Sequence, residues 1–379
     1  MIDLHLHVPM RLLEGVEAPR DVITGMTRGG GVRAAVFKIA ARLFDFRHWN
    51  TGWRVTPELL ERGDVDVAGS VLYRPFSEMD LDEPYAAPPE PAYFGKLLEL
   101  MDATEAEIAR VGHTLVTNPA DLARRGPKYV HCVEGGFHLG ATPEEVTRNV
   151  HELAARGVLY VTLAHLFWRR VAANAPALPF LPDPLYRAVF PQPAGAALSP
   201  LGEAAVRAMH ATGVLVDISH MREDAIAATF ALIERLDAET GRDPREYPVI
   251  ATHAGYRFGG QSYNLTDGTI AKIAARGGVV GLILAAHQIK DGLRRTNTRT
   301  LQETVDLLAR HIDAIGPAHA ALGSDLDGFI KPTLGGVESA ADLRPLADAL
   351  RARYPDDADA LLDGNARRLI ERRFRTAPS

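Results

Sequence analysis

The feature that most constrains the fold of this chain is a series of eight short apolar runs separated by segments with helical periodicity. Apolar runs that alternate with amphipathic helices are typical of βα units, whose consecutive strands are parallel and share one sheet. Several runs are continuously apolar, as expected for strands that are covered on both faces. The eight predicted strands are residues 1–7, 32–39, 128–135, 157–165, 213–220, 247–253, 277–285 and 320–325.

Such strands can form a closed (β/α)8 TIM barrel or an open doubly wound sheet. In a barrel, reactive side chains collect at the C-terminal ends of several strands, on one rim. Six of the predicted strands end in residues of this kind, namely His5 and His7, Glu134, His165, His220, His253 and Asp325. No glycine-rich phosphate-binding loop follows the first strand, which weakens the open-sheet alternative. We therefore predict a barrel.

The chain has 379 residues, enough for one barrel-sized domain or two ordinary ones. We predict a single domain over residues 1–379. Residues 40–127 exceed the length of one βα connection and have a proline-rich middle, so we interpret them as an insertion between the second and third strands, with a helix near residues 96–112. Residues 340–375 are predicted to form a C-terminal helical extension.

Charge and cysteine content limit the partners and the chemistry. The net charge is −6, from 42 basic and 48 acidic side chains, without the basic excess of a nucleic-acid or membrane-surface protein. The single cysteine, Cys132, excludes an internal disulfide or a cysteine-rich zinc site, so any metal must be bound by His, Asp and Glu. No apolar stretch approaches the roughly 18 to 20 residues of a membrane span, and no signal peptide precedes the first strand, so we expect a cytoplasmic protein.

The strand-end residues are of the types that bind metal ions. Side chains at positions i and i+2 of a strand point to the same side, so His5 and His7 can approach one cation. An isolated His-x-His is as readily two ordinary strand histidines, and the other strand-end residues favour the metal interpretation. Glu134 ends an apolar strand, where an unpaired carboxylate is costly, and its two oxygens can bridge two ions. His220 and His253 could hold the second ion.

Six segments, DLHLHVP, VEGG, VTLAHLF, VDISH, ATHAG and GSDLDG, resemble in order and spacing the membrane (renal) dipeptidase family, peptidase family M19 of the amidohydrolase superfamily. The resemblance extends to NLTD and LLDGNARRLI, and it is weak only over residues 40–95. It implies a TIM barrel of the metal-dependent hydrolase type with two zinc ions. His5 and His7 would bind one ion, Glu134 would bridge, and His220 with His253 would bind the other.

The resemblance also implies catalytic roles. Two ions would lower the pKa of a shared water, Asp325 would act as general base and then acid, and His165 would contact the substrate carbonyl and stabilise the oxyanion. Two positions depart from the family pattern. His7 stands where aspartate is usual, and Tyr263 stands where an arginine commonly pairs with the substrate's terminal carboxylate. Tyrosine cannot make that bidentate charged contact, and Arg257 on the same loop could replace it.

Further residues are expected near the substrate. Trp168 follows His165 by three positions, and Asn264 begins the NLTD match. Asp217 is interpreted as a hydrogen-bond partner for a ligand histidine. The main hypothesis is a zinc hydrolase that cleaves the amide bond of dipeptides. Alternatives are hydrolysis of N-acyl amino acids or another amide or ester, and a non-catalytic metal-binding scaffold. Since members of the family are often dimeric, a homodimer is a further expectation.

Overall fold

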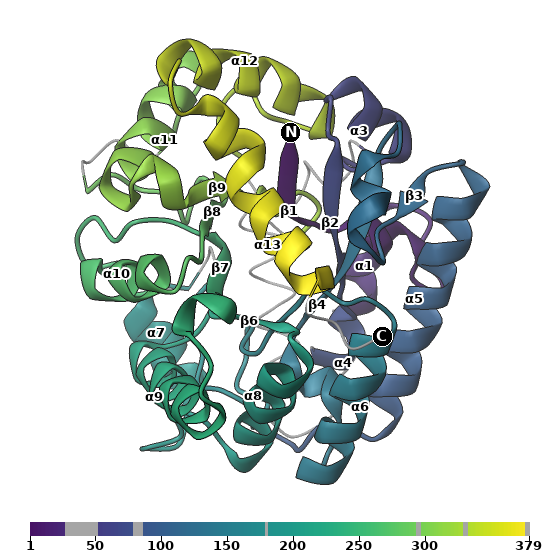
Figure 1. Cartoon of the computed structure of the whole chain (residues 1–379), viewed down its shortest axis with the longest axis vertical. Helices are drawn as coiled ribbons and strands as arrows, with labels where there is room; N and C mark the ends of the chain where they lie inside the picture. The colour runs from purple at the N-terminus through teal and green to yellow at the C-terminus, as the bar shows by residue number, and fades with distance from the viewer. Residues whose placement is uncertain (27–51, 79–85, 179–180, 293–296, 329–332, 376–379) are drawn as a thin grey trace.

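The computed structural model describes residues 1–26, 52–78, 86–178, 181–292, 297–328 and 333–375. Its centre is a closed barrel of parallel strands surrounded by helices (Figure 1). Neighbouring strands follow the order β2-β1-β9-β8-β7-β6-β5-β4, and pairing between β2 and β4 closes the ring. The barrel strands are β1 (Ile2–Leu6), β2 (Val67–Leu72), β4 (Lys128–Glu134), β5 (Tyr160–Thr162), β6 (Leu215–Asp217), β7 (Val249–Ala254), β8 (Val280–Leu282) and β9 (Ala320–Leu322). The predicted TIM barrel is confirmed.

One strand assignment needs correction. The predicted strand at 32–39 lies outside the described residues, and the strand between β1 and β4 is β2, within the segment interpreted as an insertion. A Cβ at Gly69 of β2 would lie 2.0 Å from the carbonyl oxygen of Leu4, so glycine is required where β2 approaches β1. This segment therefore contributes the barrel strand β2, as well as the predicted helix, α5.

Helices pack around the outside of the barrel (Figure 1). The α-helices are α1 (Pro19–Met26), α3 (Pro57–Arg62), α4 (Pro75–Glu78), α5 (Ala92–Arg110), α6 (Pro143–Ala155), α7 (Asp183–Val189), α8 (Pro200–Thr212), α9 (Glu223–Thr240), α10 (Asp267–Ala275), α11 (Leu301–Ile315), α12 (Leu343–Arg353) and α13 (Asn365–Arg375). Short 3-10 or π turns are η1 (Val8–Leu12), η3 (Pro119–Ala123), η4 (Gly136–Leu139), η5 (Pro244–Glu246), η6 (Pro317–His319), η7 (Ala340–Asp342) and η8 (Ala360–Gly364). A two-residue strand, β3 (Thr114–Leu115), pairs with the start of β4.

The C-terminal helix α13 runs across the end of the barrel where the strands begin (Figure 1). The Asn365 side-chain amide donates to the carbonyl oxygens of Pro317 and Ala320, both at 2.7 Å, at the start of β9. The Arg373 guanidinium donates to the carbonyl oxygen of Val158, 3.1 Å away and just before β5. This helix therefore occupies the N-terminal end of the strands and leaves the C-terminal rim for other residues.

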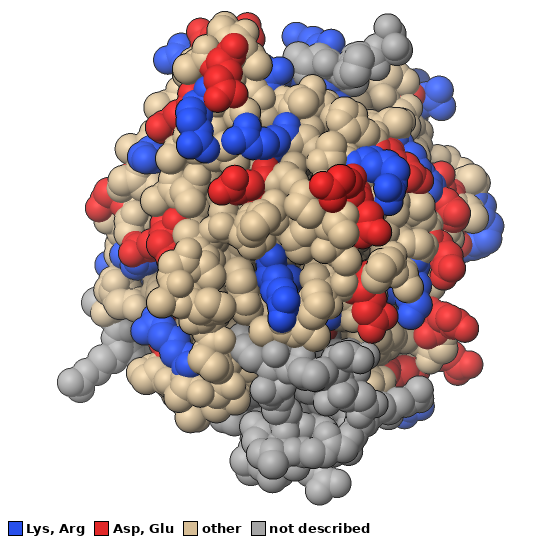
Figure 2. Space-filling view, turned by 90° about the horizontal axis from the view of Figure 1, so that it is seen from below, with Lys and Arg blue, Asp and Glu red and all other residues tan. Residues whose placement is uncertain are grey.

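The described surface carries charges of both signs. Over the face in Figure 2, basic and acidic side chains lie among one another, and neither sign forms a continuous patch on the part that is described. A broad single-sign patch is the usual electrostatic footprint of nucleic-acid binding. Among the described helices, none combines the length and the apolar character needed to cross a bilayer.

Candidate metal centre

Glu134 is the centre of a buried cluster at the C-terminal rim. It ends β4 and is only 1% exposed. Its Oε1 lies 3.3 Å from Nε2 of His5, 3.3 Å from Nε2 of His253 and 3.8 Å from Nε2 of His220, and its Oε2 lies 3.4 Å from Nε2 of His7 and of His165. The structure thus brings together all of the histidines that the sequence predicted to bind metal or substrate carbonyl.

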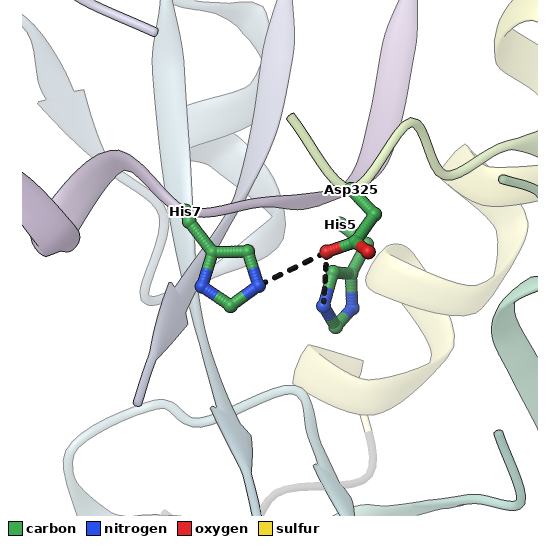
Figure 3. Close-up of side chains that lie close together, drawn as sticks. All are labelled: His5, His7 and Asp325. Atoms are coloured by element: carbon green, nitrogen blue, oxygen red, sulfur yellow. Dashed lines mark ion pairs between the residues drawn. The ribbon is translucent and has the colours of Figure 1, made fainter. Parts of the chain in front are cut away.

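Asp325 reaches the cluster from the loop after β9. Its Oδ1 lies 3.1 Å from Nε2 of His7 and 3.7 Å from Nε2 of His5, and the three side chains point toward one another (Figure 3). Asp325 and His220 have φ angles of 61° and 64°, in the left-handed region that non-glycine residues rarely adopt. A Cβ at Gly328 would come within 1.8 Å of Asp325 Oδ1, so this glycine leaves the space that the carboxylate fills. The backbone conformations of the two loops are therefore specialised to position the side chains of Asp325 and His220.

The cluster fits a pair of metal ions. Nε2 of His5, Nε2 of His7 and both oxygens of Glu134 are buried without a hydrogen-bond partner among the described residues, an arrangement that is unfavourable unless a cation binds them. Two ligands about 2.0 Å from one tetrahedral zinc ion are about 3.3 Å apart, close to the measured spacings. Three sets of potential ligand atoms each lie within 4.8 Å of one another: His5, His7 and Asp325; His5, Glu134 and His253; and Glu134, His165 and His220.

The protonation states also suit metal binding. Burial holds the pKa values of His5, His220 and His253 well below their ordinary range, and burial lowers the pKa of His7 to about 4. These imidazoles are therefore neutral at pH 7, the form that donates a lone pair to a metal ion. Burial, followed by the nearby charge of Glu134, raises the pKa of Asp325 well above its usual value.

His165 has a different environment from the other histidines. Its Nδ1 lies 2.5 Å from Oε2 of Glu78, and the same carboxylate accepts hydrogen bonds from the Tyr73 hydroxyl at 2.7 Å and the Phe167 backbone N–H at 3.0 Å. Burial lowers the pKa of His165, but the charges of Glu134 and Glu78 outweigh it and raise the pKa to about 9. His165 is therefore held as a proton donor.

Glu78 and Tyr73 were missed by sequence reasoning. Both follow β2, the strand that the sequence analysis did not recognise, and Glu78 lies on the four-residue helix α4. A carboxylate shortly after a barrel strand would have been a usable signal once β2 was assigned, because loops after strands form the functional rim.

A narrow cavity of about 40 Å³ adjoins the cluster. His165, His220, Tyr263, Asp325 and Gly328 line one part, and the remaining lining residues are Leu166, Ala177, Leu178, Ile283, His287 and Gln288. The Tyr263 hydroxyl donates to the carbonyl oxygen of His253 at 2.7 Å, and its ring stands edge-on to His220 with centroids 5.0 Å apart. Tyr263 therefore shapes the cavity with its ring.

Three residues predicted to contact substrate are absent from the described lining of this cavity. The Arg257 guanidinium is held by Glu223 and by the carbonyl oxygens of Ser262 and Asn264. The Asn264 amide donates to the carbonyl oxygen of Gln288 at 2.8 Å. Trp168 is buried, with 4% of its surface exposed, in the hydrophobic core. These positions support the loops around the cavity.

A parallel barrel with histidines and carboxylates converging at its C-terminal rim defines the class of metal-dependent TIM-barrel hydrolases. Within that class, the model of the membrane dipeptidase family (peptidase family M19) matches residues 1–377. The chain belongs to this family, as its motifs predicted.

Individual relatives are distant. An uncharacterized protein in the pqqA 5′ region of Klebsiella pneumoniae is 32% identical over 47% of this chain and 61% of its own length. Dipeptidase aclJ of Aspergillus oryzae is 26% identical over 68% of this chain and 50% of its own length, so the chain spans only about half to three-fifths of these relatives. A metallopeptidase from Rhodobacter sphaeroides, solved with a phosphinate mimic of the dipeptide L-Ala-D-Ala, superposes with a TM-score of 0.68 at 20% identity over 98% of both chains. At that identity the likeness shows the shared fold.

Proposed function

We propose that this chain is a binuclear zinc dipeptidase. In this proposal His5 and His7 would hold one ion, His220 and His253 would hold the other, and Glu134 would serve both. The observation that carries it is the buried Glu134 carboxylate, whose oxygens have no hydrogen-bond donor among the described residues but lie 3.3 to 3.8 Å from five histidine Nε2 atoms. His220 Nε2 and His253 Nε2 are 2.9 Å apart, as expected for two neutral imidazoles that share a cation.

The bound ions would supply Lewis acidity, which lowers the pKa of water and polarises the carbonyl under attack. Asp325 is placed to accept the proton of the attacking water and to pass it to the leaving amine. Because Glu78 accepts the Nδ1 proton of His165, the Nε2 side of that ring faces Glu134 and can donate to the carbonyl oxygen as negative charge develops. Burial of the whole cluster excludes bulk water and strengthens these interactions.

The family and the Aspergillus relative, which is named a dipeptidase, support a dipeptide substrate. One observation favours a second candidate, an amide or ester that has no carboxylate at the position of Tyr263. That hydroxyl already donates to the His253 carbonyl, so it has no second proton for a carboxylate.

The test combines metal content with substrate turnover. We expect two zinc ions per chain by elemental analysis and release of amino acids from a panel of L,L and L,D dipeptides. The same dipeptides with an amidated C-terminus separate the two candidate substrates, and N-acetyl amino acids test whether a free amine is required. Glu134→Gln should lose both metal and turnover. Two bound ions without turnover of any panel member would contradict the hydrolase proposal and favour the metal-binding scaffold.

A further inference from the structure

A single hydroxyl group lies beneath two of the proposed ligand histidines. Thr252 is fully buried on β7, and its Oγ1 lies 3.0 Å from Nδ1 of His5 and 2.9 Å from Nδ1 of His253. The two imidazole rings lie close together, with centroids 3.8 Å apart. The same Oγ1 lies 2.6 Å from Oδ2 of Asp217. One oxygen atom thus touches one ligand of each proposed ion and a buried carboxylate.

The surroundings of Asp217 determine which group donates. Its Oδ1 accepts the backbone N–H of Ser219 at 2.9 Å and of Thr252 at 3.0 Å, and backbone N–H groups can only donate. Its Oδ2 accepts the Thr162 hydroxyl at 2.6 Å. Asp217 therefore acts as an acceptor on both oxygens, and the Thr252 hydroxyl proton goes to Oδ2.

A threonine hydroxyl has one proton and two lone pairs. With its proton donated to Asp217, Thr252 can only accept hydrogen bonds from His5 and His253. Both rings must then carry their proton on Nδ1, which leaves the Nε2 lone pairs free. Those two Nε2 atoms are the ones that lie 3.3 Å from Oε1 of Glu134, toward the proposed ions.

Resting on the proposed metal centre, we infer that Thr252 is a positioning residue that fixes the tautomer and orientation of one histidine ligand of each ion. Asp217 acts through Thr252, without contacting either ring itself. A hydrogen bond to the second ring nitrogen of a ligand histidine orients the ring, and its loss commonly lowers metal affinity.

The two histidines do not depend on Thr252 equally. The Tyr160 hydroxyl also lies 2.8 Å from Nδ1 of His5, and its own proton goes to the carbonyl oxygen of Leu4 at 2.9 Å. His5 therefore has a second acceptor for its Nδ1 proton. For His253, Thr252 is the one partner of Nδ1 in the described part of the chain. Loss of the Thr252 hydroxyl should consequently weaken the ion bound by His220 and His253 more than the ion bound by His5 and His7.

The experiment measures stepwise zinc dissociation constants by chelator competition for the full chain and five variants. Thr252→Val keeps the shape of the side chain and removes the hydroxyl. It should raise one of the two zinc dissociation constants roughly 10- to 100-fold and leave the other within about 3-fold of its value in the unmodified chain. Tyr160→Phe should leave both within that margin, and the double variant should weaken both. Thr252→Ser should restore the affinity. Thr162→Val is the matched control, because Thr162 donates the same 2.6 Å hydrogen bond to Asp217 Oδ2 and has no hydrogen bond to a histidine in the part of the chain that the structure describes.

Equal losses in Thr162→Val and Thr252→Val, or no loss in Thr252→Val, would overturn the inference. A second measurement does not depend on folding of the variants: ¹⁵N NMR of histidine-labelled, zinc-loaded protein should show protonated Nδ1 atoms for His5 and His253. A bare Nδ1 on either ring would equally refute it. Failure of the unmodified chain to bind zinc would instead refute the proposed function, so the two ideas fail separately.

Discussion

Replacing Glu78 by glutamine tests whether the orientation of His165 is needed for catalysis. In the structure the Glu78 carboxylate accepts three hydrogen bonds, from His165, Tyr73 and Phe167. Glutamine has the same shape but only one oxygen, so its NH₂ group must face either the Phe167 N–H or the His165 and Tyr73 protons. A buried donor left against a donor costs about 1 to 3 kcal/mol, which denaturant unfolding can measure.

The catalytic effect should exceed that of a general loss of stability. If His165 stabilises the developing oxyanion, loss of its oriented proton should lower kcat roughly 10²- to 10³-fold, the range found for removal of one oxyanion donor. KM and zinc content should change little, because Glu78 is not one of the proposed ligands and is not among the described residues that line the cavity. Tyr73→Phe is the control, since it removes another donor to the same oxygen of Glu78 and leaves the His165 contact. A folded, zinc-loaded Glu78→Gln enzyme with kcat within a few-fold of the unmodified chain would refute this role for His165.

Three further outcomes are expected. Gly328→Ala should lower kcat without unfolding the barrel, because the added Cβ would collide with Asp325 Oδ1 at 1.8 Å. Steady-state kinetics measure the loss of activity, and circular dichroism shows whether the protein is still folded. An unaltered kcat would contradict the packing argument. His131, whose Nε2 lies 3.4 Å from Oε1 of Glu105, and Arg156 lower the pKa of Glu105 from 4.5 to about 2, so its stabilising contribution is complete above about pH 4.5 and disappears as the pH falls toward 2. Because Glu105 is partly exposed, the contribution should be at most about 1 kcal/mol, and Glu105→Gln should lack this part of the pH dependence of unfolding. Removing metal with a chelator should lower the free energy of unfolding by about 2.7 kcal/mol for each ion present at 100 times its dissociation constant. In His7→Ala the chelator should lower the free energy of unfolding by less. A free energy of unfolding that does not change with chelator would argue against bound ions.

Much of the candidate site was predictable because parallel barrels place all strand C-termini on one rim. Seven of the eight predicted strands overlap observed ones, and the polar residues at their ends converge on Glu134. Neither His5 nor His253 is informative alone. The two residues become informative only when both are assigned to the C-terminal ends of strands in one parallel barrel, and that assignment does not require the detailed contacts of the strands.

The second strand was not predictable by the same reasoning. Gly69 and Ser70 interrupt the apolar pattern of β2, and Gly69 is what permits the close approach to β1. The glycine that fits β2 against β1 is thus one of the residues that concealed the strand. Failure to recognise β2 also concealed Glu78, because its position at the rim follows only from the strand before it.

Arg257 illustrates a different limit of prediction from sequence, namely the hydrogen-bond partners of a side chain on a loop. Its charge and its place on the loop made it a reasonable substitute for the arginine that Tyr263 replaces, but sequence does not show that the carbonyl oxygens of Ser262 and Asn264 already accept its protons. A guanidinium has five donors in a fixed geometry, and local backbone acceptors compete with any ligand. Whether an arginine binds substrate therefore depends on the loop conformation, which periodicity does not specify.

The two ends of the barrel show different relations between stability and function. At the C-terminal rim, His220 and Asp325 hold left-handed backbone conformations, each costing of order 1 kcal/mol or more, and buried carboxylates lie beside unpaired imidazole nitrogens. At the opposite end, Asn365 and Arg373 of α13 satisfy backbone carbonyls at the starts of β9 and β5. Because α13 connects strands distant in sequence without touching the rim residues, it can offset the strain of the site while leaving the ligand geometry unconstrained. The helix across one end of the barrel therefore holds together the strands whose opposite ends carry these strained residues.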